Sequence, residues 1–424
     1  MAARISTGGA FPEGETGPEA TSETMKPVLI GKIEVGNDKV HAAVLLAKED
    51  GAITVGDDRS VRVWLKRDSG QYWPSICHFC PAICSCVDFN EETRRLFVGL
   101  ENGTIQEFGL TEDYNAIQHK RDYYTHSGGV AKVCFSMSCE WVLSAGRDKQ
   151  LVWQCSETGR RIGGFALGGW PTALEFDASV RYAFVGDYSG NISVLRIHDG
   201  GRCELISKLS AHTGCVKAVS WDAERQFLFS GSTDQLIIAW DIGGKKGHAY
   251  ELNGHQSKLS ALQYAKGKKR LFSASDSGSL VCWDMSVDRF MTPEWRSKDT
   301  CEKCESPFFW NVRAMWDKKT VGLRQHHCRL CGKAVCQACS TQTMRYPKMG
   351  YEYAVRICDF CVKEFQDAQN GQHSTLETDL TSLAVFHNSK HSVVCMHLNE
   401  VQGRLLTVGT DRVLKIWDVT KLVR

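Results

Sequence analysis

Eight cysteines within residues 301–361 carry the most specific chemical signal in the chain. They form four Cys-x-x-Cys pairs, with 23, 4 and 18 residues between successive pairs: Cys301, Cys304, Cys328, Cys331, Cys336, Cys339, Cys358 and Cys361. Thiolates in such pairs bind zinc, and two tetrahedral sites of four ligands use every one of them. Closed sites leave no position for a reactive water, so we predict two structural Zn²⁺ ions. Because only four residues separate the second and third pairs, we expect interleaving, with pairs one and three on one ion and pairs two and four on the other.

Basic side chains are concentrated in the same region. Between residues 318 and 356, eight Lys and Arg residues are opposed only by Glu352, whereas the whole chain of 424 residues has a formal net charge of +2. Guanidinium groups bind phosphate oxygens through paired hydrogen bonds. Arg324, Arg329 and Arg356 are therefore candidate ligands for a phosphorylated group, and any anion site in this chain has to be local.

Two stretches beside the cysteines resemble the basic motifs of the FYVE zinc finger family: Arg324-Gln325-His326-His327-Cys328-Arg329 and Arg356-Ile357-Cys358. The resemblance implies that phosphatidylinositol 3-phosphate is recognised by a set of polar and charged side chains: Arg324, Gln325, His326, His327, Arg329, Arg356 and Asp299. Gln325 stands where the family usually has a second Arg or Lys. The W-x-x-D element of the family is represented by Trp295 and Asp299, with one extra residue between them.

An apolar tip at Val321 and Leu323 precedes the basic motif, and Lys318 and Lys319 flank it. This combination suits shallow insertion into an anionic lipid leaflet. The alternative is that both apolar side chains belong to the core of the zinc module. The surrounding loop, Glu305–His327, is longer than is usual for the family and carries further aromatic residues, which we expect to pack on the larger domain: Phe308, Phe309, Trp310 and Trp316.

The composition indicates a chain of several folded domains. Its 424 residues are enough for about two or three domains, and a hydrophobic content of 42% excludes disorder of the whole. No apolar run reaches the roughly 20 residues that cross a bilayer, and no apolar signal region marks secretion. The balanced charge gives no indication of a nucleic-acid partner. Residues 1–26, rich in Gly, Glu, Thr, Ser and Pro, are predicted to be a disordered tail.

The elements that must position these residues come from an internal repeat. Alternating apolar runs end at seven positions, separated by 44, 45, 42, 45, 43 and 134 residues: Trp64, Phe108, Trp153, Leu195, Trp240, Trp283 and Trp417. Alternation with Gly, Asp and Ser turns predicts short strands. The repeat resembles the WD-repeat family through Gly254-His255 and Trp-Asp endings such as Trp240-Asp241. The resemblance implies an all-β, seven-bladed WD40-type β-propeller, and we expect Val28–Glu34 to close its last blade as an outer strand.

The last interval exceeds the others by about 90 residues, so a separate module is inserted inside the sixth blade. The predicted organisation is a propeller over residues 27–286, a two-zinc FYVE-type finger over 294–366, a linker over 367–379, and the outer strand of blade six with blade seven over 380–424. The strand-like run Thr381–Phe386 becomes that outer strand. A propeller with such a finger before its last blade is similar to the WD-repeat-and-FYVE-domain proteins.

The polar residues of the repeats are interpreted as structural. In the WD-repeat family, residues such as His212, Asp234 and Trp240 form a hydrogen-bond network inside each blade, because buried polar groups need partners. A second group of thiols is not expected to form a third metal site: Cys77, Cys80, Cys84 and Cys86. Cys84 and Cys86 lie in alternating strand-like sequence and are interpreted as small packed hydrophobic residues. We recognise no catalytic constellation, so no enzyme is predicted.

Together these features predict a non-enzymatic adaptor. The finger would bind phosphatidylinositol 3-phosphate on the cytosolic face of early endosomes, and the propeller would hold partner proteins, with kinases and trafficking factors as candidates. Two alternatives stay open. One is a protein-interaction scaffold whose zinc module only supports folding. The other is a RING-like ubiquitin ligase, because RING domains also interleave two zinc ions.

Overall fold

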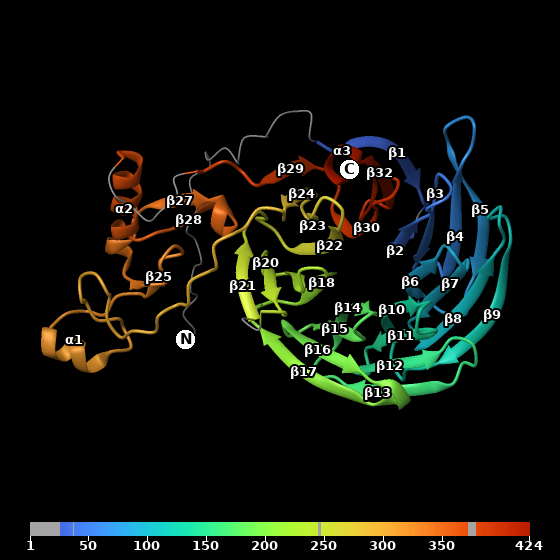
Figure 1. Ribbon diagram of the computed structural model, residues 1–424, viewed down its shortest axis with the longest axis horizontal. Coiled ribbons are helices and arrows are strands. Elements are labelled where there is room, and N and C mark those ends of the chain that lie inside the picture. The colour runs from blue at the N-terminus through green and yellow to red at the C-terminus, as the bar shows by residue number, and fades with distance from the viewer. Residues whose placement is uncertain (1–25, 37, 245–246, 372–378) are drawn as a thin grey trace, which may run out of the picture.

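The computed structural model describes residues 26–36, 38–244, 247–371 and 379–424. Seven four-stranded antiparallel sheets surround a central axis (Figure 1), which confirms the seven-bladed β-propeller expected from the repeat. The predicted tail, apart from Lys26, and residues 372–378 of the predicted linker lie outside the described residues. No helix in the described part of the chain has the length and apolar character needed to cross a membrane.

The first four blades follow the chain in order, each running from an inner to an outer strand. Blades one and two contain β2 (Val40–Leu45), β3 (Gly51–Gly56), β4 (Ser60–Lys66), β5 (Tyr72–Phe79), β6 (Cys84–Asn90), β7 (Arg95–Leu100), β8 (Thr104–Leu110) and β9 (Ile117–Tyr124). Blades three and four contain β10 (Val130–Ser136), β11 (Trp141–Gly146), β12 (Gln150–Cys155), β13 (Arg161–Ala166), β14 (Pro171–Asp177), β15 (Tyr182–Asp187), β16 (Asn191–Ile197) and β17 (Cys203–Ser210).

The last three blades include the insertion and the ring closure. Blade five contains β18 (Val216–Asp222), β19 (Phe227–Ser232), β20 (Ile237–Asp241) and β21 (Gly247–Leu252). Blade six contains β22 (Leu259–Ala265), β23 (Arg270–Ser275), β24 (Ser279–Asp284) and β29 (Ala384–Asn388). Blade seven contains β30 (Val393–Asn399), β31 (Arg404–Gly409), β32 (Val413–Asp418) and β1 (Val28–Glu34), and the short helix α3 (Thr420–Val423) follows β32. Because β1 pairs antiparallel with β32, the two ends of the described chain share one blade and the ring is closed.

A chain of buried hydrogen bonds fixes the interior of blade five. The indole Nε1 of Trp240 donates to Ser230 Oγ at 2.8 Å, and Ser230 Oγ is 2.8 Å from His212 Nε2. The other ring nitrogen, His212 Nδ1, lies 2.9 Å from Asp234 Oδ2, and the His212 side chain is fully buried. This geometry confirms that the three conspicuous polar residues of the repeat are structural.

Blade six contains the same series of buried hydrogen bonds, but without the carboxylate at its end. Trp283 Nε1 donates to Ser273 Oγ at 2.9 Å, and His255 Nε2 is 2.7 Å from the same oxygen. The strand registers of the two blades correspond, which places Ser277 where blade five has Asp234. Among the described residues His255 Nδ1 has no hydrogen-bond partner, and burial lowers the pKa of His255 from 6.5 to about 3.

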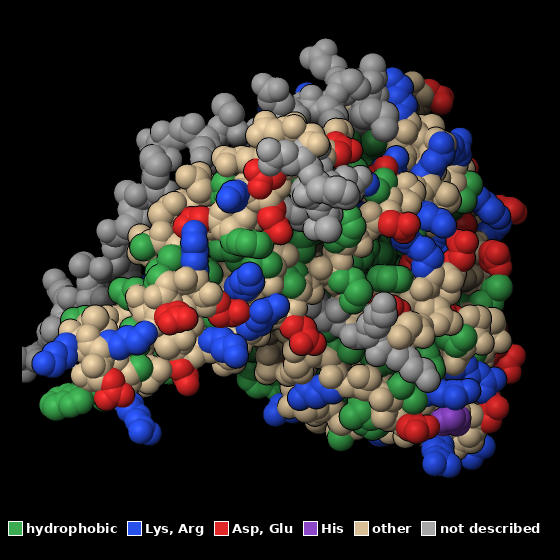
Figure 2. Space-filling view, turned by 60° about the vertical axis from the view of Figure 1, so that its left-hand side comes forward, with side chains coloured by type: hydrophobic (Ala, Val, Ile, Leu, Met, Phe, Trp, Pro, Cys, Tyr) green, Lys and Arg blue, Asp and Glu red, His purple; other side chains and the backbone are tan. Residues whose placement is uncertain are grey.

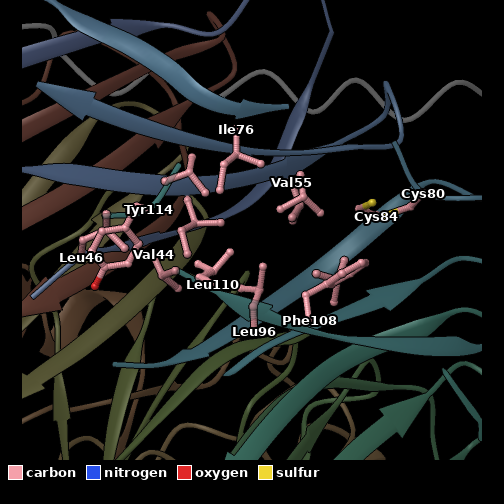
Figure 3. Close-up of a cluster of buried hydrophobic side chains, with 14 of the residues drawn as sticks. Val44, Leu46, Val55, Ile76, Cys80, Cys84, Leu96, Phe108, Leu110 and Tyr114 are labelled. Carbon is pink, nitrogen blue, oxygen red and sulfur yellow. The ribbon is translucent and has the colours of Figure 1, made fainter. Parts of the chain in front are cut away.

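Three of the four cysteines of the early repeats, Cys80, Cys84 and Cys86, belong to the hydrophobic interior, whereas Cys77 is exposed. Cys80 and Cys84 are 5% and 0% exposed and contribute to a cluster between blades one and two that also contains Val55 and Phe108 (Figure 3). The described residues contain two groups of suitable metal ligands, and neither group includes these cysteines. Cys86 is 3% exposed, so the interpretation of Cys84 and Cys86 as small packed hydrophobic residues agrees with their placement.

The zinc module is inserted between β24 and β29, the third and fourth strands of blade six. The outer strand begins at Ala384, three residues after the predicted Thr381, because Ser382 and Leu383 hydrogen-bond to Glu352 of the module instead. The regular elements of the module are short: α1 (Val312–Lys318), β25 (His326–His327), β26 (Ala334–Val335), β27 (Thr343–Tyr346), β28 (Tyr351–Arg356) and α2 (Asp359–Gln369).

The module lies beside the rim of the propeller and contacts the outer strand of blade five (Figure 1). Asn253 N donates to Gly350 O at 2.8 Å, and Glu352 N donates to Asn253 O at 3.0 Å. Gly350 has a φ of +88°, and a Cβ at this position would lie 2.0 Å from the carbonyl oxygen of Glu251. Backbone bonds and a glycine-dependent close approach therefore hold the module against a neighbouring blade.

Candidate metal centre and basic surface

Eight thiols of the inserted module form two groups of four. The members are Cys301, Cys304, Cys336 and Cys339 in one group, and Cys328, Cys331, Cys358 and Cys361 in the other. All Sγ atoms within a group lie within 4.8 Å of one another, and Cys304–Cys336 and Cys328–Cys361 are separated by 3.7 and 3.8 Å. Zinc–sulfur bonds of about 2.3 Å in a tetrahedron require sulfur atoms about 3.8 Å apart. The residues fit Zn²⁺, and the predicted pairing of the first with the third and the second with the fourth pair is confirmed.

Backbone amides support the thiolate form of these ligands. Cys336 N donates to Cys301 Sγ at 3.4 Å, and Cys358 N donates to Cys328 Sγ at 3.2 Å. Four thiolates fill each tetrahedron, so the ions would hold the module together and leave no position for a substrate.

The short hairpin of β25 and β26 and the end of β28 position part of the predicted lipid site. β25 consists of His326 and His327, and Arg356 is the last residue of β28. Arg356 Nη1 donates to the carbonyl of Ser340 at 2.7 Å, which fixes its guanidinium. The pKa of His326 is lowered by burial and by the positive charges of Arg356 and Arg324. The charges of Arg324 and Arg356 therefore act on His326.

Trp295 organises a second part of the site. Its ring stacks on His327 with centroids 4.9 Å apart and an interplanar angle of 13°. The guanidinium of Arg329 lies over the same indole at 4.3 Å, a cation–π contact. His327 Nε2 is 3.1 Å from the carbonyl of Arg296, so this nitrogen carries a proton that it donates. The sequence spacing indicated Trp295 only as part of an irregular motif. Its contacts with His327 and Arg329 are seen only in the folded structure.

The two residues that depart from the family pattern make their own contacts. Gln325 Nε2 donates to the carbonyl of Lys298 at 3.4 Å. Asp299 is exposed, and its Oδ1 accepts a hydrogen bond from the indole of Trp310 at 3.1 Å. The long loop therefore supplies a partner to Asp299, a contact that motif spacing did not indicate.

The expected packing of the loop aromatics on the propeller is wrong. Phe308 is fully buried, but in the core of the zinc module, where it contacts the cysteine cluster. Phe309, Trp310 and Trp316 are 59%, 43% and 84% exposed. The reason is the helix α1 within the loop, which the sequence analysis did not predict and which lies at the end of the module farthest from the propeller (Figure 1).

Glu352 does not belong to the basic surface that its position in the sequence suggested. Its side chain is fully buried between the module and blade six, where it accepts hydrogen bonds from Leu383 N at 2.9 Å and Ser382 Oγ at 2.8 Å. Burial raises the pKa of Glu352. Glu352, the one acidic residue between residues 318 and 356, is therefore buried and does not offset the basic charge at the surface of this segment.

Comparisons with protein families agree with the two-part architecture. The family model of the FYVE zinc finger matches residues 293–367, and the family model of the WD domain, G-beta repeat, matches residues 117–153, 203–241 and 247–284. Among solved structures, the WD40 β-propeller domain of Doa1 resembles the fold with a TM-score of 0.59 at 12% sequence identity, over 92% of this chain and 96% of that one. This likeness concerns the fold alone.

Curated relatives are similar over nearly the full length. WD repeat and FYVE domain-containing protein 2 of Mus musculus is 53% identical over 94% of this chain and 97% of its own. WD repeat and FYVE domain-containing protein 1 of Homo sapiens is 50% identical over 95% of both chains. WD repeat and FYVE domain-containing protein 2 of Caenorhabditis elegans is 45% identical over 95% of this chain and 94% of its own.

Proposed function

The chain belongs to the family of WD repeat and FYVE domain-containing proteins, and from this membership and its site geometry we propose that it is a non-enzymatic adaptor on early endosomes. The finger binds phosphatidylinositol 3-phosphate in the cytosolic leaflet, and the propeller holds partner proteins there. The two zinc ions act by holding the finger in its binding shape.

One observation carries the lipid assignment: Arg329 N donates to the carbonyl of Arg356 at 3.1 Å, which joins the two basic motifs beside the hairpin of β25 and β26. A phosphate group carries two negative charges or nearly so, and guanidinium forks bind its oxygens with geometric specificity. Arg329, whose guanidinium lies over the indole of Trp295, supplies further donors at the edge of the same hairpin, and Trp295 also stacks on His327. We assign Arg324, Arg329 and Arg356 to the phosphate and inositol oxygens, and Gln325 and Asp299 to positions beside the headgroup.

The apolar tip supports contact with a bilayer. Val321 is 88% exposed and Leu323 is 38% exposed, so neither serves as a core residue of the finger. Lys318 and Lys319 beside them are exposed as well. Each basic side chain near an anionic leaflet contributes about 1 kcal/mol, and shallow burial of the tip adds to that.

The propeller provides the platform for partners. Figure 1 looks onto one broad surface of the ring, and the finger lies beside it at the rim. WD-repeat propellers share a frame and differ in their surface residues, so the fold alone names no partner. Kinases and trafficking factors are the partner classes that we propose to examine first.

Vesicle co-sedimentation of the zinc-loaded full chain tests the proposal. Vesicles that differ only in the phosphoinositide are compared for wild type, Arg329→Ala and Arg356→Ala, with Arg160→Ala, an exposed propeller arginine, as the matched control. We expect selective sedimentation with phosphatidylinositol 3-phosphate, lost in both finger variants with their zinc retained and kept in the control. Absence of any phosphoinositide preference in the wild type would overturn the proposal and leave the finger as a structural zinc module.

A further inference from the structure

The helix α1 and its flanks expose an unusual set of apolar side chains. Six of them between residues 309 and 323 are 38–88% exposed: Phe309, Trp310, Val312, Trp316, Val321 and Leu323. Val312 and Trp316 are one helical turn apart, so they share a face of α1. Scattered exposed hydrophobic residues are ordinary, but six of them within one short segment of a small module indicate an interaction surface.

The backbone of the loop is fixed in a way that keeps these side chains outward. Asn311 caps α1, with its side-chain oxygen accepting from Ala314 N at 3.1 Å. On the inner side, a Cβ at Gly322 would lie 2.3 Å from Phe309 Cα and 2.6 Å from Met315 Sδ. Lys318 Nζ donates to the carbonyl of Glu305 at 2.8 Å. α1 therefore packs on its own loop through Met315, and its other face has no apolar partner within the described residues.

Charge identifies the class of partner. The exposed segment carries Arg313, Lys318, Lys319 and Arg324 and a single acidic residue, Asp317. In Figure 2, the part of the finger that projects at the left shows a hydrophobic side chain with Lys and Arg side chains and also Asp or Glu side chains near it. Tryptophan with basic neighbours is typical of the water–lipid boundary, where the ring lies among the headgroups and cations meet anionic lipids.

We propose that α1 is a second membrane-contact element, which places Trp316 and Val312 in the interfacial layer of an anionic bilayer without reading the 3-phosphate. This inference rests on the proposed function for the orientation of the finger towards a membrane, and adds a contact to it. The surface is continuous with the tip at Val321, because Thr320 N donates to Met315 O at 3.1 Å and joins the two segments. α1 supplies affinity for the leaflet in general, and the arginine site supplies selectivity for the headgroup.

The test uses the full zinc-loaded chain and two vesicle compositions. Both contain phosphatidylcholine and phosphatidylserine, and one also contains phosphatidylinositol 3-phosphate. Trp316→Ala is compared with Trp316→Phe and with Trp73→Ala, which removes a propeller tryptophan that is 56% exposed. We expect Trp316→Ala to weaken binding to both compositions by about tenfold, which corresponds to ~1.4 kcal/mol. Trp316→Phe should recover most of the binding, and Trp73→Ala should match the wild type.

Quenching of tryptophan emission by brominated lipids gives a second measurement. The wild type should be quenched on binding, Trp316→Phe should lose part of that quenching, and Trp73→Phe should not. Zinc content, measured on every variant, should stay at the wild-type value because Trp316 is an exposed residue.

The outcomes separate this inference from the proposed function. Binding of Trp316→Ala equal to the wild type on both compositions, with unchanged quenching, overturns the inference even where the 3-phosphate preference stands. Binding that depends on Trp316 but shows no phosphoinositide preference supports the inference and overturns the headgroup assignment. Self-association of lipid-free protein that disappears in Trp316→Ala would make a second copy of the chain the occupant of this surface, and would overturn the bilayer as its partner.

Discussion

Ser277→Asp should stabilise the propeller, because it adds the carboxylate that is missing from the buried hydrogen-bond network of blade six. His255 Nδ1 is buried without a partner among the described residues. In blade five the corresponding carboxylate, Asp234, lies 2.9 Å from His212 Nδ1 and also accepts from Thr213 N at 2.9 Å. The shared strand register makes the same geometry available at position 277.

The size of the effect follows from the bonds gained and lost. Leaving a buried donor unsatisfied costs about 1–3 kcal/mol. Ser277 now shares hydrogen bonds with Ser257 and Ser275, at 2.8 and 3.0 Å, and these would be lost. The new carboxylate would also lie next to Asp276. We therefore expect a net increase of about 1 kcal/mol in the free energy of unfolding at pH 7.5.

The dependence on pH gives the sharper measurement. The folded-state pKa of His255, about 3, is below the ordinary value of 6.5, so its neutral form is favoured in the folded state and stability falls as pH drops below 6.5. Between pH 7.5 and 5.5 this costs the wild type about 1.4 kcal/mol. A carboxylate at position 277 raises the folded-state pKa and removes that loss. The advantage of Ser277→Asp should consequently grow by about 1 kcal/mol on acidification.

Denaturant midpoints at pH 7.5, 6.5 and 5.5, with zinc present throughout, measure both effects. Ser277→Asn controls for size without charge, and Asp234→Ser makes the opposite change in blade five, where it should lower stability. An advantage of Ser277→Asp that is absent at pH 7.5 and does not grow at pH 5.5 would refute the assignment of His255 as an unsatisfied network residue.

Two further predictions concern the finger. Gly350→Ala should loosen the contact of the finger with blade five while both zinc ions are retained, because the added Cβ would lie 2.0 Å from the carbonyl oxygen of Glu251. Gly371→Ala is the control, because Gly371 also has a positive φ, +75°, but a Cβ there would meet nothing within 4 Å. Faster hydrogen exchange in β21 of the Gly350 variant alone would show this, and equal exchange in both variants would contradict it. Cys304→Ala should bind one zinc ion per chain instead of two by elemental analysis, because Cys304 belongs to only one thiol group; loss of both ions would contradict independent sites.

The parts of this protein that were predictable from sequence are those in which spacing carries physical meaning. A repeat of four strands has a fixed length, so the excess after Trp283 located the insertion, and Cys-x-x-Cys pairs with short and long separations indicated which thiols share an ion. The predictions that were wrong concern contacts that the sequence pattern does not show. The loop aromatics were expected on the propeller, yet Met315 and Gly322 hold α1 on its own loop. Glu352 was counted as a surface charge because sequence distance does not show that Ser382 and Leu383 bury it.

The docking of the finger on blade five has a consequence for the adaptor. The segment that follows β24 and the bonds of Glu352 with Ser382 and Leu383 join the finger to blade six, and the bonds of Asn253 with Gly350 and Glu352 join it to blade five. With three attachments to two blades, rotation of the finger would break buried backbone hydrogen bonds, each of which costs about 1–3 kcal/mol when left unmade. α1 lies at the far end of the finger, in the direction in which it projects from the rim (Figure 1). When this end enters a membrane as proposed, the rim of the propeller faces the bilayer, and both broad surfaces of the ring stay open to proteins in the cytosol.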